Sequence, residues 1–211
     1  MAKIKTFAIN VPKRKDRRKH IASVFSEHNI FDFQVVKCVP HKRGNVSLWL
    51  TIKQVIEGNK NEPYIIICED DHYFTADFSE EKLLEYIEKA QNLEADILNG
   101  GVSWFDVAVQ INTDFFWLKT FNGTQFMVVF KKFFEKITTA SFNEKDSADF
   151  KISSLSENIF TFVPFISKQK EFGYSDVTIF NNEKGKVERL FAKTSERLNL
   201  LKKVKTFYTH F

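Results

Sequence analysis

Three acidic residues in a row, Glu69-Asp70-Asp71, follow directly on the apolar run Tyr64–Cys68. An uninterrupted apolar run of this length is typical of a strand that is covered on both faces, as in a parallel sheet. Open α/β sheets bind their ligands in the crevice at the carboxyl ends of the strands. Two carboxylates about 4 Å apart repel by roughly 4 kcal/mol at an effective dielectric of about 20, and a divalent cation removes that cost. The triplet therefore predicts a metal site.

A Mg²⁺ or Mn²⁺ ion at this place would complete its coordination shell with diphosphate oxygens and water. Such a cation offsets the negative charge on a departing nucleoside diphosphate. Because side chains alternate along a strand, Glu69 and Asp71 share one face and Asp70 takes the other. We expect Asp71 to be the direct metal ligand, with Glu69 beside it. Glu69 or Asp70 would hold the water molecules of the metal or the ribose of the nucleotide.

The triplet also has other interpretations. Consecutive acidic residues after a strand often start a turn or cap a helix. A glycoside hydrolase with two carboxylates is disfavoured, because adjacent carboxylates in one turn would not flank a glycosidic bond from opposite sides. His72, the next residue, either approaches the metal or is solvated in the turn.

Basic residues gather in two segments of a chain whose formal net charge is +4. Lys13–His20 contains six Lys/Arg and one Asp, and Glu183–Lys205 contains eight Lys/Arg and three Glu. Such segments suggest an anionic partner, for example a nucleotide diphosphate, a phosphorylated lipid or a membrane surface, or they form a solvated surface. A nucleic-acid-binding or nucleotidyl-transfer protein is a further hypothesis, but the chain lacks the recognised nucleic-acid-binding motifs, and we expect no nucleic-acid partner.

Three residues near the first basic segment are candidates for contacts with the donor nucleotide. Arg17 and Arg18 suit phosphate oxygens, because a guanidinium group binds oxyanions through two parallel hydrogen bonds. An exposed helix start explains these arginines equally well. Asn10 stands at the end of the first predicted strand, where it binds the nucleotide or serves as a cap.

These residues need a scaffold, and the first half of the chain alternates predicted strands and helices. Strands are expected at residues 3–10, 31–39, 64–68 and 96–98, and helices at residues 16–28, 45–57 and 79–93. The alternation predicts a mostly parallel sheet covered by helices.

The second half of the chain has a different pattern. We expect antiparallel strands at residues 107–111, 115–121 and 125–130, a helix at 131–140 and a last strand at 159–164. A basic, helical tail is expected at about residues 183–211. The length of 211 residues is that of one domain, which would span residues 1–211.

Several classes of protein are excluded or disfavoured by composition. The chain has seven glycines and contains neither a dinucleotide-binding nor a P-loop motif. Cys38 and Cys68 are expected to be reduced thiols. No signal-peptide pattern and no membrane-spanning run occurs, so we expect a cytoplasmic protein. The basic tail interleaves leucines with Lys/Arg, and it would lie on an anionic membrane surface or dock onto its own domain.

A series of short segments resembles one known family in order and spacing. They are Phe7-Ala8-Ile9-Asn10, Lys15-Asp16-Arg17-Arg18, Gly44-Asn45-Val46-Ser47, Ile67-Cys68-Glu69-Asp70-Asp71, Ala95–Gly101, Gly123–Ile137, Asp149-Phe150-Lys151-Ile152, Pro164–Gln169 and Ser175-Asp176. Together they resemble glycosyltransferase family 25, the lipopolysaccharide-type β-galactosyltransferases. The resemblance covers the chain to about Val177.

The resemblance implies a nucleotide-diphosphosugar transferase fold of the GT-A type and transfer with inversion at the anomeric carbon. It also implies a UDP-sugar donor, UDP-galactose as the first guess, and a cell-surface glycan, lipopolysaccharide or lipid-linked saccharide as acceptor. Inversion needs a base that takes the proton of the acceptor hydroxyl. By its place in the motif order Asp149 is the candidate, with Asp146 as the alternative. A plain helix N-cap is the other interpretation of Asp149.

The chain departs from the family pattern at two places. Leu48 stands where the family has a histidine, and the strand near Gln125–Phe130 lacks the usual Ala-Tyr pair. An alternative function is therefore that of a catalytically degenerate protein with this fold, serving as a glycan-binding or scaffold subunit. Metal-dependent nucleotide binding distinguishes the two hypotheses.

Overall fold

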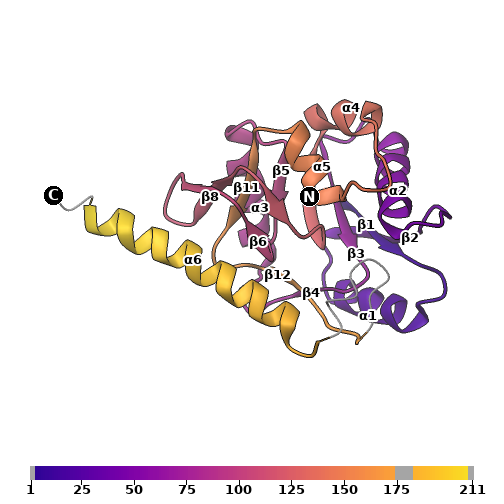
Figure 1. The fold of residues 1–211 in the computed structure, drawn as a ribbon, viewed down its shortest axis with the longest axis horizontal. Coiled ribbons are helices and arrows are strands. Elements are labelled where there is room, and N and C mark those ends of the chain that lie inside the picture. Colours follow the sequence, from indigo (N-terminus) through magenta and orange to yellow (C-terminus); the bar gives the residue numbers. More distant parts are fainter. Residues whose placement is uncertain (1–2, 174–182, 209–211) are drawn as a thin grey trace.

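The computed structural model describes residues 3–173 and 183–208, which form a mixed α/β fold around one eight-stranded sheet (Figure 1). The order of strands across the sheet is β2-β1-β3-β10-β5-β11-β8-β7. Strands β10 and β8 run antiparallel to their neighbours, and the others share one direction. The sheet strands are β1 (Ile4–Asn10), β2 (Phe31–Lys37), β3 (Tyr64–Glu69), β5 (Ile97–Asn99), β7 (Ala108–Gln110), β8 (Phe115–Leu118), β10 (Phe126–Phe130) and β11 (Ile159–Phe162).

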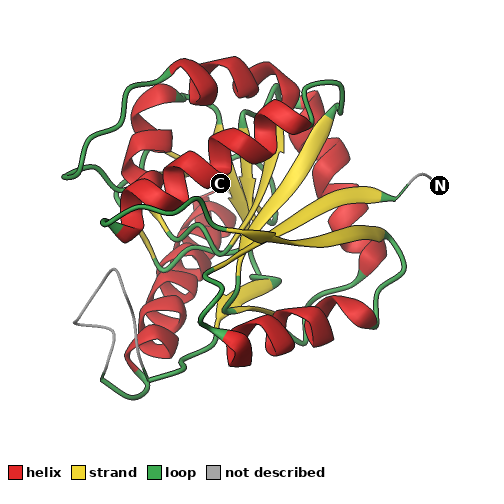
Figure 2. Cartoon of the chain, turned by 90° about the vertical axis from the view of Figure 1, so that its right-hand side faces the viewer, coloured by secondary structure: helices red, strands yellow, loops and turns green. Residues whose placement is uncertain are grey.

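Helices cover both faces of this sheet (Figure 2). Helices α1 and α3 pack on one face, and α2, α4, α5 and α6 pack on the other. Their bounds are α1 (Lys15–Ser26), α2 (Gly44–Gly58), α3 (Glu80–Asn92), α4 (Lys131–Thr139), α5 (Ala148–Leu155) and α6 (Lys186–Tyr208). None of these helices, in the ranges the structure describes, has both the length and the apolar character needed to cross a lipid bilayer.

Strand β3 lies inside the sheet and is buried on both faces, as its apolar run predicts. Ile65 and Ile67 pack into the core under α2, whereas Ile66 and Cys68 pack into the core under α1 and α3. Full burial of each isoleucine side chain stabilises the fold by about 1.5–3 kcal/mol. This core on both faces fixes the register of β3. It places the carboxyl end of β3 where the parallel strands of the sheet end.

Strands occur in all three segments expected between residues 107 and 130 and run antiparallel to their neighbours, as predicted, but they are not consecutive in the sheet. Only β7 and β8 pair with each other, and β10 lies in the middle of the sheet, antiparallel to both β3 and β5. All five side chains of Phe126–Phe130 are buried, which suits a central strand and not the half-exposed strand of a hairpin. The insertion of β10 brings the turn before it next to the end of β3.

Two small sheets complete the fold, and Phe121 is the only residue of their strands that belongs to a predicted element, since the strand expected at residues 115–121 ends at Leu118. One pairs β4 (His72–Phe74) with β12 (Ser167–Gln169), and the other pairs β6 (Trp104–Phe105) with β9 (Phe121–Asn122). The chain at β12 passes so close to Gly101 that a Cβ atom there would lie 2.3 Å from the carbonyl oxygen of Ser167. Glycine at this position therefore lets the two segments cross. The motif segment Ser175-Asp176 lies outside the described residues.

Candidate functional site

A cavity of about 210 Å³ lies at the carboxyl end of β3, and we call it the acidic pocket. Segments far apart in the sequence line it, among them the start of α1, the end of β3, the turn before β10, the start of α5 and the loop after β12. The lining residues are Arg14, Arg17, Asn45, Leu48, Glu69, Asp71, Asn122, Gly123, Thr124, Ser147, Ala148, Asp149, Gln169, Lys170, Glu171, Phe172, Gly173 and Val187.

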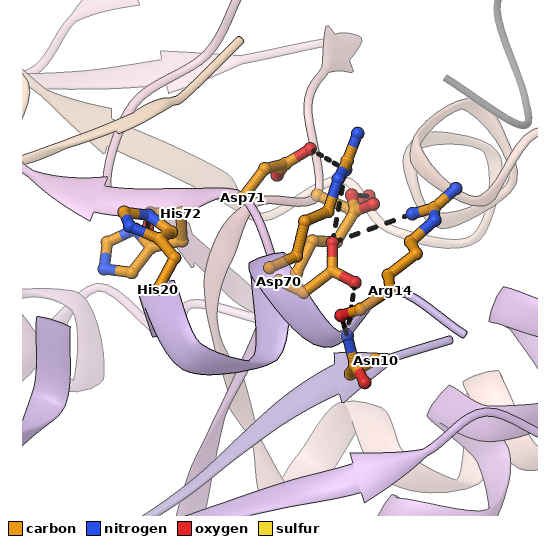
Figure 3. A network of polar contacts seen from close by, with 9 residues as sticks. Asn10, Arg14, His20, Asp70, Asp71 and His72 are labelled. Carbon is orange, nitrogen blue, oxygen red and sulfur yellow. Dashed lines mark hydrogen bonds and ion pairs between the residues drawn. The ribbon is translucent and has the colours of Figure 1, made fainter. Parts of the chain in front are cut away.

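The acidic triplet is divided between two environments, as the alternation of side chains predicts. Glu69 and Asp71 line the acidic pocket. Asp70 is turned away from it and is only 3% exposed. Its oxygens accept hydrogen bonds from Asn10 Nδ2 (2.8 Å) and Arg17 Nη1 (3.2 Å) (Figure 3). Asp70 and Asn10 therefore join α1 and β1 to the end of β3. Their positions do not support the prediction that they contact the nucleotide.

Two arginines border the pocket beside the triplet. Arg17 Nη1 lies 3.0 Å from Asp71 Oδ2, and Arg14 Nη1 lies 3.7 Å from Asp70 Oδ1. Arg17 was expected here. Arg14 was missed, because nothing distinguishes it from its neighbours within a run of basic residues. Arg18 is exposed and is not among the lining residues, so the predicted contact of Arg18 with the donor phosphates has no support from its position.

Two of the carboxylates that line the pocket, Glu69 and Asp71, are difficult to ionise. Burial, together with the charge of Asp71, raises the pKa of Glu69 to about 8, although the hydroxyl of Thr124 donates a 2.5 Å hydrogen bond to it. Burial also raises the pKa of Asp71 to about 6, against the opposing effect of Arg17. Asp71 Oδ1 is buried and accepts no hydrogen bond from the described residues. A cation beside these oxygens would remove the cost of ionising them.

The chemistry of the donor set fits a divalent cation that is only partly coordinated by protein. Among residues 3–173 and 183–208, no group of three or more His, Cys, Asp or Glu side chains is arranged to hold a metal. Mg²⁺ is commonly bound through one or two carboxylates, with phosphate oxygens of the substrate and water as its other ligands. Glu69 and Asp71 match that kind of site, in which the substrate completes the shell.

His72 is neither a solvated turn residue nor part of the acidic pocket, which corrects its interpretation from the sequence. Its side chain is buried among aromatic rings, with Phe74 and Phe126 at centroid distances of 4.5 and 4.9 Å. Its Nδ1 lies 2.8 Å from Ser167 Oγ. Burial lowers the pKa of His72 well below the usual value. The residue is therefore a neutral core histidine that holds β4 against β12.

Asp149 is far from the acidic triplet in the sequence, but it lines the same pocket as Glu69 and Asp71. It is in the first turn of α5, and Ser147 holds the N-cap position, so the N-cap interpretation is wrong. Asp149 Oδ2 accepts hydrogen bonds from Asn122 Nδ2 (2.5 Å) and from the N–H of Gly123 (3.2 Å). Asp146 is not among the lining residues, and its Oδ2 accepts the N–H of Asn143 within a loop.

The loop Gln169–Gly173 closes another side of the acidic pocket and ties it to α6. The N–H of Lys170 donates a 2.7 Å hydrogen bond to the carbonyl oxygen of Asp71. The next residue, Glu171, accepts hydrogen bonds from the N–H groups of Gly185 (2.6 Å) and Val187 (2.7 Å) at the start of α6. One short loop therefore contacts both the acidic strand end and the C-terminal helix.

Comparison with known proteins gives a fold and no family. No protein-family model and no curated protein sequence matches this chain. The crystal structure of A197 from STIV superposes with a TM-score of 0.58 at 12% identity, covering 80% of this chain and 86% of the other. UDP-glucose pyrophosphorylase complexed with UDP-glucose superposes with a TM-score of 0.50 at 11% identity, covering 93% of this chain and 100% of the other. The chain thus has the mixed α/β fold, with a large and mostly parallel sheet, that these structures share.

Proposed function

We propose that this protein is a metal-dependent, inverting glycosyltransferase that moves a hexose from a UDP-sugar to a glycan acceptor. The observation that carries the proposal is the convergence of Glu69, Asp71 and Asp149 on one pocket bordered by two arginines. The fold is compatible with a nucleotide-sugar ligand, since UDP-glucose pyrophosphorylase, which shares it, has been crystallised with UDP-glucose. The resemblance to glycosyltransferase family 25 supports the type of reaction and suggests galactose as the sugar.

The donor side of the site would consist of Asp71, Glu69, Arg14 and Arg17. Asp71 and Glu69 would hold Mn²⁺ or Mg²⁺, which supplies positive charge to the departing diphosphate. Arg14 and Arg17 would bind the diphosphate oxygens, for which the guanidinium geometry is well suited. Binding of the metal and the donor would also replace the ion pair between Arg17 and Asp71, because Asp71 would bind the cation and Arg17 would bind the diphosphate.

The acceptor side of the site would consist of Asp149 and the aromatic residues next to it. Asp149 would take the proton of the attacking hydroxyl, while Asn122 and the N–H of Gly123 fix the orientation of its carboxylate. Phe150 follows Asp149 and is 47% exposed, and its ring lies 6.0 Å from that of Trp104, which is 40% exposed. Neither ring is among the residues that line the acidic pocket, so the two rings would contact a part of the acceptor that extends beyond it.

A second candidate function is nucleotidyl transfer, in which a sugar phosphate displaces pyrophosphate from a nucleoside triphosphate. The observation that favours it is the fold shared with UDP-glucose pyrophosphorylase. The two reactions release different products, so they are easily distinguished. Glycosyl transfer releases UDP, whereas nucleotidyl transfer from UTP releases pyrophosphate.

The test is a thermal-shift series with UDP, GDP, CMP and UTP, each with and without Mn²⁺. A ligand at about 100 times its dissociation constant stabilises the protein by roughly 2.7 kcal/mol, which a melting curve resolves. We expect stabilisation by UDP that requires Mn²⁺, lost in Arg14→Ala, whose side chain lines the pocket, and kept in the control Arg18→Ala. No shift with any nucleotide would contradict the proposal and favour the non-catalytic glycan-binding hypothesis. A UTP preference with pyrophosphate release would favour the second candidate.

A further inference from the structure

The loop that leads to Asp149 is attached to helix α2 by the side chain of Asn45. Asn45 lies in the first turn of α2 and lines the acidic pocket. Its Nδ2 donates hydrogen bonds to the carbonyl oxygens of Glu144 (2.9 Å) and Asp146 (2.7 Å), which follow it by 99 and 101 residues in the chain. Because a carbonyl oxygen can only accept, the amide must present its NH₂ group to both partners. Asn45 therefore joins two segments that are far apart in the sequence.

Hydrogen bonds within the loop give it a shape but do not attach it to the rest of the protein. The N–H of Asn143 donates to Asp146 Oδ2 (2.9 Å), and the N–H of Asp146 donates to the carbonyl oxygen of Asn143 (3.1 Å). The start of the loop is anchored by Phe142, whose ring stacks on that of Trp49 at a centroid distance of 4.8 Å. Between this contact and α5, the bonds from Asn45 hold the backbone of the loop against α2.

Arg43 also reaches this loop, but its contact is weak. Its Nε lies 3.2 Å from Glu144 Oε2, and the two side chains are 64% and 62% exposed. An ion pair between side chains this exposed is screened by water and salt and contributes little. In residues 3–173 and 183–208, the side chains of other elements that hydrogen-bond to residues 143–147 are those of Arg43 and Asn45. Asn45 is therefore the main polar attachment of the loop.

The attached loop sets where α5 begins. Ser147 follows Asp146 and holds the N-cap position, and its carbonyl oxygen accepts a 2.9 Å hydrogen bond from the N–H of Lys151. Asp149 comes two residues later, in the first turn of α5. A base must lie about 2.6–3.2 Å from the hydroxyl whose proton it takes. An error of about 1 Å in such a position can lower the rate about 10²-fold. A shift of the loop would displace the start of α5 and Asp149 with it.

We propose that Asn45 is a positioning residue for Asp149, because it holds the loop before α5 and thereby sets the distance of the carboxylate from the substrate. Asn122 and the N–H of Gly123 hold the same carboxylate from another side and fix its orientation. Asn45 instead fixes the backbone from which the side chain extends. The consequence for catalysis rests on the proposed function, whereas the attachment of the loop does not.

The experiment compares Asn45→Ala with Asn59→Ala in the full chain. Asn59 is the matched control, because its Nδ2 also donates to a backbone carbonyl oxygen, that of Val55 (2.8 Å), but at the other end of α2. Hydrogen exchange, measured without any ligand, reports the attachment of the loop. We expect the N–H groups of residues 143–151 to exchange about tenfold faster in Asn45→Ala and at the unmodified rate in Asn59→Ala.

Steady-state rates with Mn²⁺, UDP-galactose and a saccharide acceptor report the position of Asp149. Asn45→Ala should lower kcat by about tenfold to a hundredfold. It should leave the KM for the donor and the UDP thermal shift unchanged, because Asn45 has no contact with Glu69, Asp71, Arg14 or Arg17 among the hydrogen bonds described. Asn45→Gln, which keeps the NH₂ group on a longer side chain, should restore part of the rate and part of the slow exchange.

Unchanged exchange in Asn45→Ala, or faster exchange with an unchanged kcat, would overturn the proposal. So would an equal loss of kcat in Asn59→Ala, or an effect confined to the KM for the donor. Absence of transfer by the unmodified protein would instead contradict the proposed function, and with it the role of Asn45 in catalysis. The exchange rates would still show whether Asn45 holds the loop, so the two failures are distinguishable.

Discussion

Arg17 Nη1 lies 3.0 Å from Asp71 Oδ2, so one oxygen of this pocket carboxylate is paired within the protein. The other oxygen, Oδ1, accepts no hydrogen bond from the described residues. Asp71 therefore has one oxygen that is fixed in place and one that is oriented for a new partner. A carboxylate held in this way can bind a cation without first being ordered.

Replacing Asp71 by Asn should abolish Mn²⁺-dependent binding of UDP and leave the protein folded. The amide keeps the shape of the side chain but cannot supply a negative charge to a cation. Turnover should fall by a factor on the order of 10²–10³, as it does when one group that stabilises transition-state charge is removed. Thermal shifts with UDP and Mn²⁺ measure binding. A variant that is still stabilised by the pair would show that Asp71 is not the metal ligand.

Replacing Asp70 by Ala should have the opposite effect, a large loss of stability. Asp70 is buried and receives hydrogen bonds from Asn10 and Arg17, with Arg14 close by. Removing one partner of a buried ion pair costs roughly 3–5 kcal/mol. Urea unfolding at neutral pH measures the change against Asp71→Ala, whose side chain lines the pocket. Equal stability of the two variants would contradict the claim that Asp70 stabilises the fold while Asp71 belongs to the pocket.

Replacing Asp149 by Asn should block transfer and preserve donor binding. A positioned base contributes about 10²–10⁴-fold to the rate, so transfer should fall by that range. Release of UDP in the presence of acceptor measures transfer, and the UDP thermal shift measures donor binding. Asp146→Asn is the matched control, because Asp146 is a nearby acid outside the pocket lining. Loss of transfer in the control but not in Asp149→Asn would reverse the assignment.

Replacing Trp104 or Phe150 by Ala should raise the KM for a saccharide acceptor and leave the KM for the donor unchanged. Loss of one stacking ring removes on the order of 1 kcal/mol of contact, or about fivefold to tenfold in affinity. Initial rates over a series of acceptor concentrations measure the effect. Phe207→Ala, an exposed aromatic residue on α6, is the control. An effect on the donor KM alone would place the two rings outside the acceptor site.

His72 should lower the stability of the metal-free protein as the pH falls, whereas Glu69 and Asp71, whose pKa values are raised, raise the stability over the same range. The pKa of His72 is lowered by burial, so the unfolded chain takes up a proton at about pH 6.5 while the folded chain does not. The stabilising contribution is therefore present above about pH 6.5 and is lost as the pH falls, with a limiting slope of about 1.4 kcal/mol per pH unit.

Urea unfolding at about pH 7.5 and about pH 5 tests this dependence. The double variant His72→Phe, Ser167→Ala suits the aromatic surroundings and leaves no hydroxyl without its partner. Relative to the unmodified protein, it should gain stability between about pH 7.5 and about pH 5, whereas His41→Gln, at an exposed position, should behave like the unmodified protein. An unchanged pH dependence in the double variant would refute the role of His72.

The end of β3 could be predicted from the sequence because its signal is local. The apolar run Tyr64–Cys68 specifies a strand buried on both faces, and alternation then puts Glu69 and Asp71 on one side of it and Asp70 on the other. The structure has this arrangement. The pattern of alternating strands and helices in the first half also follows from local periodicity.

The remainder of the pocket could not be predicted, because it depends on contacts between distant segments. Thr124 reaches Glu69 only because β10 inserts between β3 and β5. The periodicity of a single strand does not determine the order of the strands in a sheet. Asn122 has no more signal in the sequence than an ordinary turn residue. The resemblance to glycosyltransferase family 25 suggested Asp149 as the base. Its position in the same cavity as Asp71 follows only from the fold.

The hydrogen bonds of Glu171 to the start of α6 have a consequence for the geometry of the acidic pocket. Glu171 follows Lys170, whose N–H donates to the carbonyl oxygen of Asp71, so one short loop joins the start of α6 to the acidic strand end. A displacement of that end of α6 would therefore be transmitted to the backbone of Asp71 and would change the spacing of the carboxylates that line the pocket.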